Sequence, residues 1–352
     1  MARKKRGGGG RQRARQRQQY DELDKYPVMP PHAFARIVRD KQTLNIIYQI
    51  IEPPLTKKEQ EQRDEIMDIF IRSLTANIEE IDSNPEAYVR TAMDKVIKSY
   101  SMKINKKSKS KLFYYLRRDL IGYGKMDVLM NDVNVEDISL DGTNVPIFAY
   151  HRKFESVETT CVWETDEELE SYVIKLAQRC GKHISVAEPL LDATLMDGSR
   201  IVMKLGHEIS TRGSAFCIRR FKDDPFSPAD IVAFRTMSSL MVAYLWIAFQ
   251  NEVPMLFVGG TASGKTTTLN AMCIFIPWQM KIVSIESTRE VNIPQPNWVP
   301  GLTRQGFGGE SDEGVIGEFE LLKAALRERP EYIIVGEIRG AEAYVLFQAM
   351  AT

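Results

Sequence analysis

A glycine-rich turn followed by a lysine and hydroxyl side chains is the clearest chemical pattern in the sequence. It satisfies the phosphate-binding pattern G-x-x-x-x-G-K-[ST] at every position. Glycines let a backbone approach phosphate oxygens closely, and N–H groups at a helix start present partial positive charge to an anion. Lys265 would reach the β/γ-phosphates of a nucleotide and Thr266 would hold Mg²⁺. The expected nucleotide-binding residues are Gly259, Gly260, Thr261, Ala262, Ser263, Gly264, Lys265, Thr266 and Thr267.

Such a loop requires a strand before it and a helix after it. The apolar residues 255–258 predict the strand, and a helix is predicted from Lys265 toward Phe275, ending at Pro277. A chance glycine-rich turn is the alternative interpretation. The apolar run before the loop and the lysine after it favour the nucleotide site.

Two further apolar segments, 281–286 and 332–337, each end in a carboxylate, Glu286 and Glu337. Strands and helices alternate in this part of the chain, which is typical of a parallel α/β sheet. Such sheets bind ligands beyond the carboxyl ends of their strands. We therefore expect both acids at the catalytic site, although a strand-end acid often serves only as a cap or an ion-pair partner.

The composition is that of an ordinary globular protein. The chain has 352 residues, of which 43% are hydrophobic and 27% charged, enough for two or three domains. Its four cysteines are scattered without a C-x-x-C pair, which favours reduced thiols over a disulfide or zinc framework. No signal peptide is visible. The longest apolar stretch, 237–249, is too short to span a bilayer and predicts a core helix.

Charge is unevenly distributed along the chain. The net charge is zero, yet residues 1–19 hold eight Lys and Arg and no acid, so the remainder is acidic by eight. This tail has no apolar face and is predicted to be disordered. It would be attracted to an anionic lipid surface in preference to nucleic acid, or it is a solvated tail with no single partner.

Residues 20–111 predict a small, mostly helical N-terminal region. Residues 44–51 resemble a strand, and a capping box over 56–59 begins an amphipathic helix. The lysine cluster at 103–111 is interpreted as a solvated loop.

Residues 112–221 predict an α+β domain of short strands and single helices. A second capping box, at 165–168, begins a helix that ends at Gly181, and strands are expected at 201–205 and 216–221. Ser227-Pro228 predicts a helix start, so the linker is placed at 222–226, before an α/β domain over 227–352.

The motifs GGTASGKTTT, SIESTREV, GFGGE and LKAALRERPEYIIVGEIRGAEAYVLFQAMAT resemble the type II/IV secretion-system ATPase superfamily. The resemblance is greatest to the archaeal branch that powers type IV pili and archaella, and it covers about residues 45–352. It implies a RecA-like P-loop ATPase domain behind a PAS-like domain. It further implies a homo-hexamer on a polytopic membrane platform protein, in the cytoplasm at the inner face of the membrane, with ATP bound between the two domains of each subunit.

The resemblance also implies roles for individual residues. Glu286 would polarise the attacking water, accompanied by Glu290, and Glu337 would be oriented toward Mg²⁺ through water. Arg200, Arg219 and Arg220 are the candidates for arginines that reach a phosphate from the N-terminal domain. For each of the three, a salt bridge on a strand surface is the alternative.

Two features depart from the family pattern. The family usually has Asp where this chain has Ser287, and it continues past the MAT sequence into a histidine box, whereas this sequence stops at Thr352. We therefore expect a fragment, an interrupted gene or a split subunit, able to bind ATP and hydrolysing it poorly. Three functions stay open: an assembly motor, a related retraction or DNA-transport motor, and a non-hydrolysing scaffold subunit.

Overall fold

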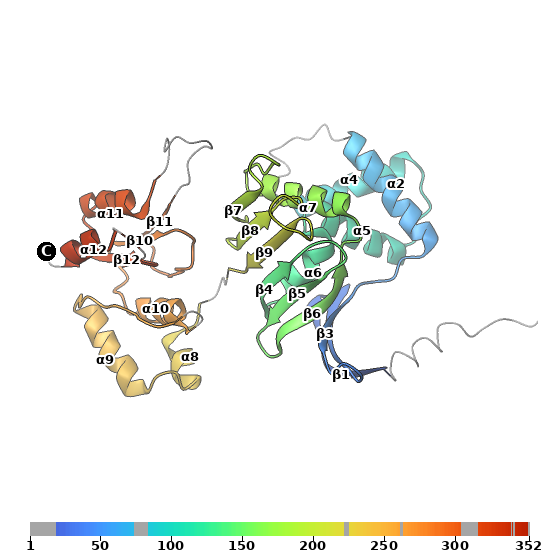
Figure 1. Ribbon diagram of the computed structural model, residues 1–352. Helices are drawn as coiled ribbons and strands as arrows, with labels where there is room; N and C mark the ends of the chain where they lie inside the picture. Colours follow the sequence, from blue (N-terminus) through green and yellow to red (C-terminus); the bar gives the residue numbers. More distant parts are fainter. Residues whose placement is uncertain are drawn as a thin grey trace, which may run out of the picture. The chain divides into compact units, whose positions relative to one another are not determined.

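The computed structural model describes residues 19–73, 84–221, 225–260, 263–303, 316–338, 340 and 342–350. The predicted basic tail therefore lies almost wholly outside the described residues. The chain divides into two compact units, Met1–Arg220 and Phe221–Thr352 (Figure 1). The division falls beside the linker expected at 222–226. Each unit is described by itself.

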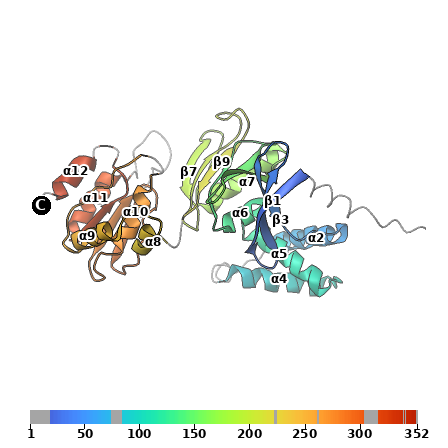
Figure 2. The same cartoon turned by 90° about the horizontal axis from the view of Figure 1, so that it is seen from below.

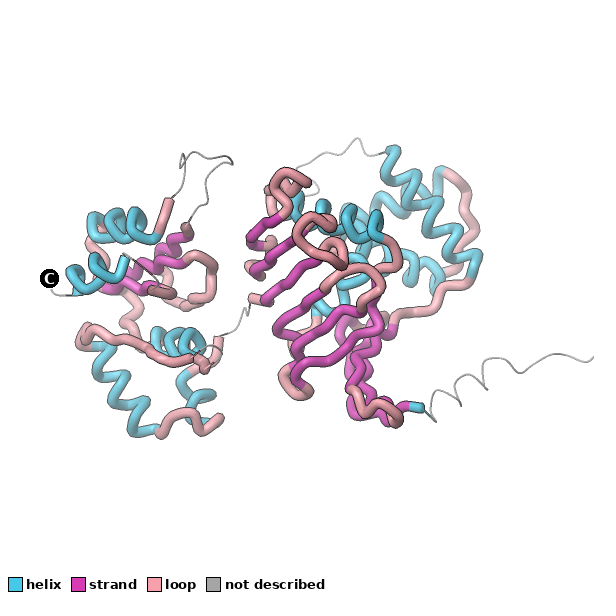
Figure 3. The backbone as a smooth tube through the Cα atoms, in the orientation of Figure 1, coloured by secondary structure: helices cyan, strands magenta, loops and turns pink. Residues whose placement is uncertain are grey.

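Unit 1 contains a nine-stranded sheet, whose strands are magenta in Figure 3. The strand order is β1-β2-β3-β6-β5-β4-β9-β8-β7, and neighbours are antiparallel except for the parallel pair β3 and β6. The strands are β1 (Tyr20–Met29), β2 (Ala33–Asp40), β3 (Ile46–Ile51), β4 (Val135–Leu140), β5 (Pro146–His151), β6 (Glu155–Val162), β7 (Leu190–Thr194), β8 (Arg200–Lys204) and β9 (Ala215–Arg219).

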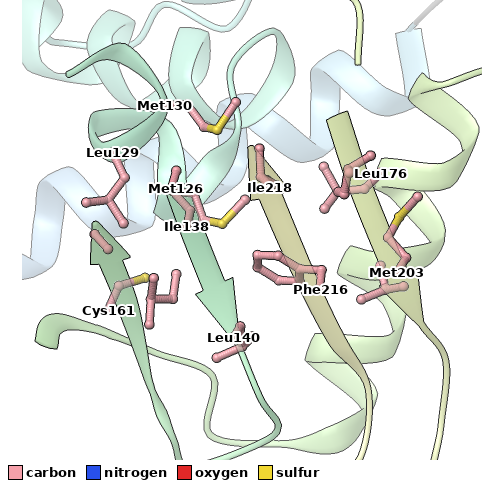
Figure 4. Packing of buried hydrophobic residues seen from close by; sticks show 14 of the residues in the cluster. Met126, Leu129, Met130, Ile138, Leu140, Cys161, Leu176, Met203, Phe216 and Ile218 are labelled. Carbon is pink, nitrogen blue, oxygen red and sulfur yellow. The ribbon is translucent and has the colours of Figure 1, made fainter. Parts of the chain in front are cut away.

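Helix α7 (Asp166–Arg179) and the short α6 (Asp127–Asn131) pack on this sheet. Figure 4 shows Leu129 and Leu176 from these helices packed with Phe216, Ile218 and Met203 from the strands. Thr165 caps α7 by accepting a hydrogen bond from Glu168 N, and Gly181 has a positive φ of 68° just after the helix. The predicted start and end of this helix are confirmed.

The remaining helices of unit 1 form a group of their own (Figure 2). They are α2 (Lys57–Ser73), α4 (Pro85–Ser99) and α5 (Lys106–Leu120). Ile66, Met93 and Leu112 are buried between them. The predicted capping box is present, because Thr56 N donates to Glu59 Oε2 at 2.8 Å and Glu59 N donates to Thr56 Oγ1 at 3.3 Å.

Two expectations for the N-terminal region are wrong. Residues 20–51 form three strands of the large sheet rather than part of a helical domain, and only the strand at 44–51 was predicted. The polar sequence of β1 hides its strand character, since β1 is an edge strand and can therefore also accommodate Pro27. The lysine cluster is not simply a loop: α5 begins at Lys106, capped by Asn105, and runs past residue 111 to Leu120.

Unit 2 is a three-layer α/β arrangement. Its parallel strands, in the order β11-β10-β12, are β10 (Ile282–Glu286), β11 (Trp298–Leu302) and β12 (Tyr332–Val335). One face packs against α8 (Pro228–Ala233), α9 (Ser239–Gln250) and α10 (Lys265–Cys273), and the other against α11 (Glu318–Arg327) and α12 (Glu342–Met350) (Figure 1). Ser227 caps α8 as predicted. All five residues of β10 are buried, as expected for a strand covered on both faces.

The strand expected at 255–258 is not formed in the structure. Residues 253–260 are described without secondary structure, and the side chains of Leu256 and Val258 are 61% and 83% exposed. An apolar run becomes a strand only when a neighbouring strand pairs with it. Among the described residues no strand pairs with this segment.

Candidate functional site

The glycine loop, residues 259–264, leads directly into α10. Gly264 is the N-cap of α10 in the left-handed conformation, with φ of 85°, which favours glycine. A Cβ on Gly259 would lie 2.5 Å from Ser263 Oγ, so a side chain at this position would displace the serine hydroxyl. Thr261 and Ala262 lie outside the described residues.

Lys265 and Ser263 both hydrogen bond to the same backbone oxygen. Lys265 Nζ donates to Gly260 O at 2.7 Å, and Ser263 Oγ donates to it at 2.8 Å. Thr266 and Thr267 are half-buried in the first turn of α10. The N-terminus of a helix is favourable for an anion, and the nucleotide-binding role of these residues stays a prediction.

Glu286, the last residue of β10, is the most unusual acid of unit 2. It is 2% exposed, and its Oε1 accepts hydrogen bonds from Glu290 N at 2.9 Å and Val291 N at 2.8 Å. Its Oε2 is buried and has no hydrogen-bond partner in the described part of the chain. Burial raises the pKa of Glu286 to about 7, partly offset by the two backbone N–H groups. A carboxylate with such a pKa and a spare oxygen suits a general base near neutral pH.

Glu337 follows β12, the neighbour of β10. The two strands are parallel, with Ile285 opposite Val335, and Gly336 N donates to Ile285 O at 2.9 Å. Glu286 and Glu337 therefore end adjacent strands at the same edge of the sheet, as the sequence predicted. They differ in environment, because Glu337 is exposed. A Cβ on Gly336 would lie 3.0 Å from Glu286 Cγ, so the glycine keeps room for the buried carboxylate.

The segment after β10 positions the remaining charged groups. Glu290 is exposed and contributes its N–H rather than its carboxylate to Glu286. The Arg289 guanidinium lies 5.4 Å from the ring centre of Phe221 and 5.5 Å from that of Trp298. Ser287 is exposed.

Asn270 and Gln295 connect α10 to the segment that follows β10. The sequence analysis missed both residues. The Asn270 side chain bonds to the backbone at Glu290 and Asn292, and Gln295 Nε2 donates to the carbonyls of Cys273 and Ile276 at the end of α10. Both side chains are buried. A polar amide in a helix interior is unfavourable for the helix itself and could have drawn attention to Asn270.

The three candidate arginines lie in unit 1. Arg200 and Arg219 are cross-strand partners on β8 and β9. Arg200 makes a two-point ion pair with Asp192, and Arg219 lies 3.6 Å from Asp137 with 65% of its side chain exposed. The Arg220 side chain donates to the backbone carbonyls of Asp132 and Val135. The salt-bridge alternative is therefore present for Arg200 and Arg219, and Arg220 binds backbone.

Comparison with known proteins identifies the family. A family model described as type II/IV secretion system protein matches residues 156–352, more than half of the chain. The chain belongs to this family. It is 37% identical over 332 residues to the uncharacterized protein MJ0900 of Methanocaldococcus jannaschii, covering 93% of this chain and 58% of that protein. The first four relatives, all from this archaeon, are covered over 33% to 65% of their own length.

More distant relatives include a named secretion protein. The chain is 29% identical over 197 residues to the type IV secretion system protein VirB11 of Bartonella henselae, covering 46% of this chain and 54% of that protein. Among solved structures, the Legionella pneumophila ATPase DotB has 17% identity and a TM-score of 0.45, covering 64% of this chain and 62% of that chain. That score is too low to transfer geometry.

The described residues contain neither a membrane-spanning helix nor a cluster of metal-binding side chains. None of the helices there combines the length and apolar character that a membrane crossing requires. In the same ranges, no three His, Cys, Asp or Glu side chains converge as a metal-binding group.

Proposed function

We propose that the chain is an ATP-hydrolysing motor subunit that powers assembly of type IV pilus-like filaments or protein secretion. The observation that carries this proposal is the buried Glu286 carboxylate, whose Oε2 has no partner among the described residues, on a segment tied to the helix that follows the glycine loop. Membership of the type II/IV secretion system family supports the proposal.

The residues divide the chemistry as follows. Backbone N–H groups of the glycine loop and Lys265 would bind the β/γ-phosphates, and Thr266 with Glu337 would hold Mg²⁺, whose charge would favour phosphoryl transfer. Glu286 takes a proton from the attacking water, and Glu290 keeps the Glu286 carboxylate oriented through its backbone N–H. Phosphoryl transfer depends mainly on positioning and charge neutralisation, so these groups and an arginine suffice. Arg219, the most exposed of the three candidates by its side chain, is the best placed to leave its ion pair for a phosphate.

At the level of assembly, we propose a RecA-like ATPase domain and a PAS-like N-terminal domain. Six such subunits would form a homo-hexamer against a polytopic membrane platform protein, at the cytoplasmic face of the membrane. The similarity to a type IV secretion system protein supports a role in a secretion machine. A second candidate is a nucleotide-binding scaffold that hydrolyses ATP poorly. Ser287 favours it, because a hydroxyl stands where the resemblance expects a second carboxylate beside Glu286.

ATP turnover by the chain, with Mg²⁺, tests the proposal. Lys265→Ala should abolish nucleotide binding or reduce turnover by about 100-fold or more, because it removes the charge that binds the transferred phosphate. Lys103→Ala, at an exposed lysine of unit 1, is the matched control and should leave both unchanged. Glu337→Gln should keep nucleotide binding and lower turnover. Binding without turnover in the unmodified chain would support the scaffold instead, and unchanged activity in Lys265→Ala would refute the nucleotide site.

A further inference from the structure

Asn270 lies within α10, and its side chain hydrogen bonds to the backbone of a different segment, residues 290–292. Its Nδ2 donates to Glu290 O at 2.8 Å, and its Oδ1 accepts from Asn292 N at 3.1 Å. The residue is 8% exposed, so both bonds form in a largely dry environment, where an unmade hydrogen bond is costly. One amide thereby bonds to the two consecutive peptide groups on either side of Val291.

The same segment, residues 290–292, also holds the Glu286 carboxylate. The N–H groups of Glu290 and Val291 both donate to Glu286 Oε1. Residues 290–292 therefore bond to Asn270 through one carbonyl and one N–H, and to Glu286 through two N–H groups. If this segment shifted, Glu286 Oε1 would lose its donors, and the direction of the partnerless Oε2 would change with it.

We propose that Asn270 is a positioning residue for Glu286, fixing the carboxylate relative to the helix that begins at Lys265. The inference rests on the proposed function, in which Glu286 acts on the attacking water. The inference adds to the proposed function that hydrogen bonds connect the glycine loop to Glu286. Helix α10 carries Lys265 at its start and Asn270 about one and a half turns later.

An amide is the side chain that this geometry requires. Asparagine supplies a donor for Glu290 O and an acceptor for Asn292 N at the same time. An aspartate would place a carboxylate against a carbonyl oxygen, and an alanine would leave both backbone groups without this partner. The competing interpretation is purely structural: Asn270 only satisfies two buried backbone groups. The two interpretations differ in whether Glu286 titrates differently when Asn270 is changed.

The charged groups around Glu286 stay the same when Asn270 is replaced by a neutral residue, so a change in the pKa of Glu286 can be attributed to its hydrogen bonds. Arg289 and Glu290 are the charged groups that act on it from the following segment, with opposite signs, and the adjacent strand β12 presents the uncharged Gly336. A neutral substitution at Asn270 changes none of these charges. It changes only whether the two N–H donors stay in place, and those donors favour the ionised carboxylate.

The test compares Asn270→Ala and Asn270→Gln with Asn297→Ala, an exposed asparagine that donates to Gln279 O at 3.4 Å. ATP affinity and kcat are measured in the full chain from pH 5.5 to 9. We expect Asn270→Ala to keep ATP affinity within about threefold, to lower kcat about tenfold, and to move the acid limb of kcat to higher pH. Asn270→Gln should recover part of the loss, and the control should behave as the unmodified chain. A fall in kcat with an unmoved acid limb would overturn the proposal.

A second readout separates this inference from the proposed function. The Glu286 carboxyl is titrated by ¹³C NMR in a Lys265→Ala chain, which needs no turnover. If the unmodified chain hydrolyses no ATP, the proposed function fails, while a raised Glu286 pKa in the Asn270→Ala, Lys265→Ala double variant still supports the coupling. If Asn270→Ala does not fold, Asn270→Ser, neutral and smaller than asparagine, replaces it, and an unchanged pKa there refutes the positioning role.

Discussion

Asp132 of unit 1 and Glu286 of unit 2 are both almost completely buried, and the structure satisfies their carboxylates in opposite ways. Asp132 of unit 1 is 1% exposed and accepts hydrogen bonds from the Tyr26 and Tyr48 hydroxyls at 2.6 and 2.7 Å, and from Asn134 N at 2.9 Å. Glu286 of unit 2 is equally buried, yet both of its donors bond to one oxygen. Equal burial therefore does not imply an equal role.

The Asp132 cluster extends into a complete chain of donors and acceptors. His151 Nδ1 accepts from Lys153 N at 3.1 Å, so the neutral ring carries its proton on Nε2, which lies 2.9 Å from the Tyr26 hydroxyl. Tyr26 in turn donates to Asp132. The cluster ties β1, β3 and β5 to the turn after α6, which identifies Asp132 as a structural centre. The partnerless oxygen of Glu286 identifies a group held ready to bond with something else.

The largest effect should come from Glu286→Gln. Turnover should fall by about 100-fold or more with nucleotide affinity nearly unchanged, because the amide keeps the shape of the carboxylate and cannot take a proton from water. Glu290→Gln, which removes an exposed carboxylate and keeps the backbone donor, should cost less than tenfold. Steady-state turnover and equilibrium ATP binding measure both. Equal losses of turnover in the two variants would contradict the proposal that Glu286, and not Glu290, acts on the attacking water.

Asp132→Ala should act on stability rather than on chemistry. Three buried or half-buried donors lose their acceptor, so the free energy of unfolding of unit 1 should fall by about 3 kcal/mol. Asp21→Ala, which removes an exposed ion pair with Lys41, should cost under about 1 kcal/mol. Denaturant unfolding followed by hydrogen exchange in unit 1 measures both. A loss in Asp132→Ala as small as in the control would contradict the structural role.

The sequence predicted those features of unit 2 that depend on residues close together in the chain. The glycine loop, α10 and the two strand-end acids follow from short apolar runs and a fixed spacing. The burial of Glu286 and the Asn270 bonds depend on residues 20 or more positions apart, which no local pattern reveals. Strands β1 and β2 were missed, and the polar sequence of the edge strand β1 explains why its strand character is hidden. The strand at 255–258 was predicted because an apolar pattern does not report whether a neighbouring strand is present to pair with it.

The smallest expected effect is on the pH dependence of stability, which should have opposite signs in the two units. The pKa of Glu286 is raised from 4.5 to about 7, so its folded form retains a proton that the unfolded chain releases, and unit 2 should lose stability as pH rises from about 5 to 7. Burial lowers the pKa of His151, so unit 1 should instead gain stability as pH rises through 6.5.

Hydrogen exchange of each unit, corrected for the intrinsic pH dependence of exchange, measures the two slopes separately. Glu286→Gln should flatten the slope of unit 2 by on the order of 2 kcal/mol between pH 5 and 8. It should leave unit 1 unchanged, and His151→Gln should do the converse. If the stability of both units changes in the same direction with pH, burial does not raise the pKa of Glu286. Glu286 would then have no reason to act as a general base near neutral pH.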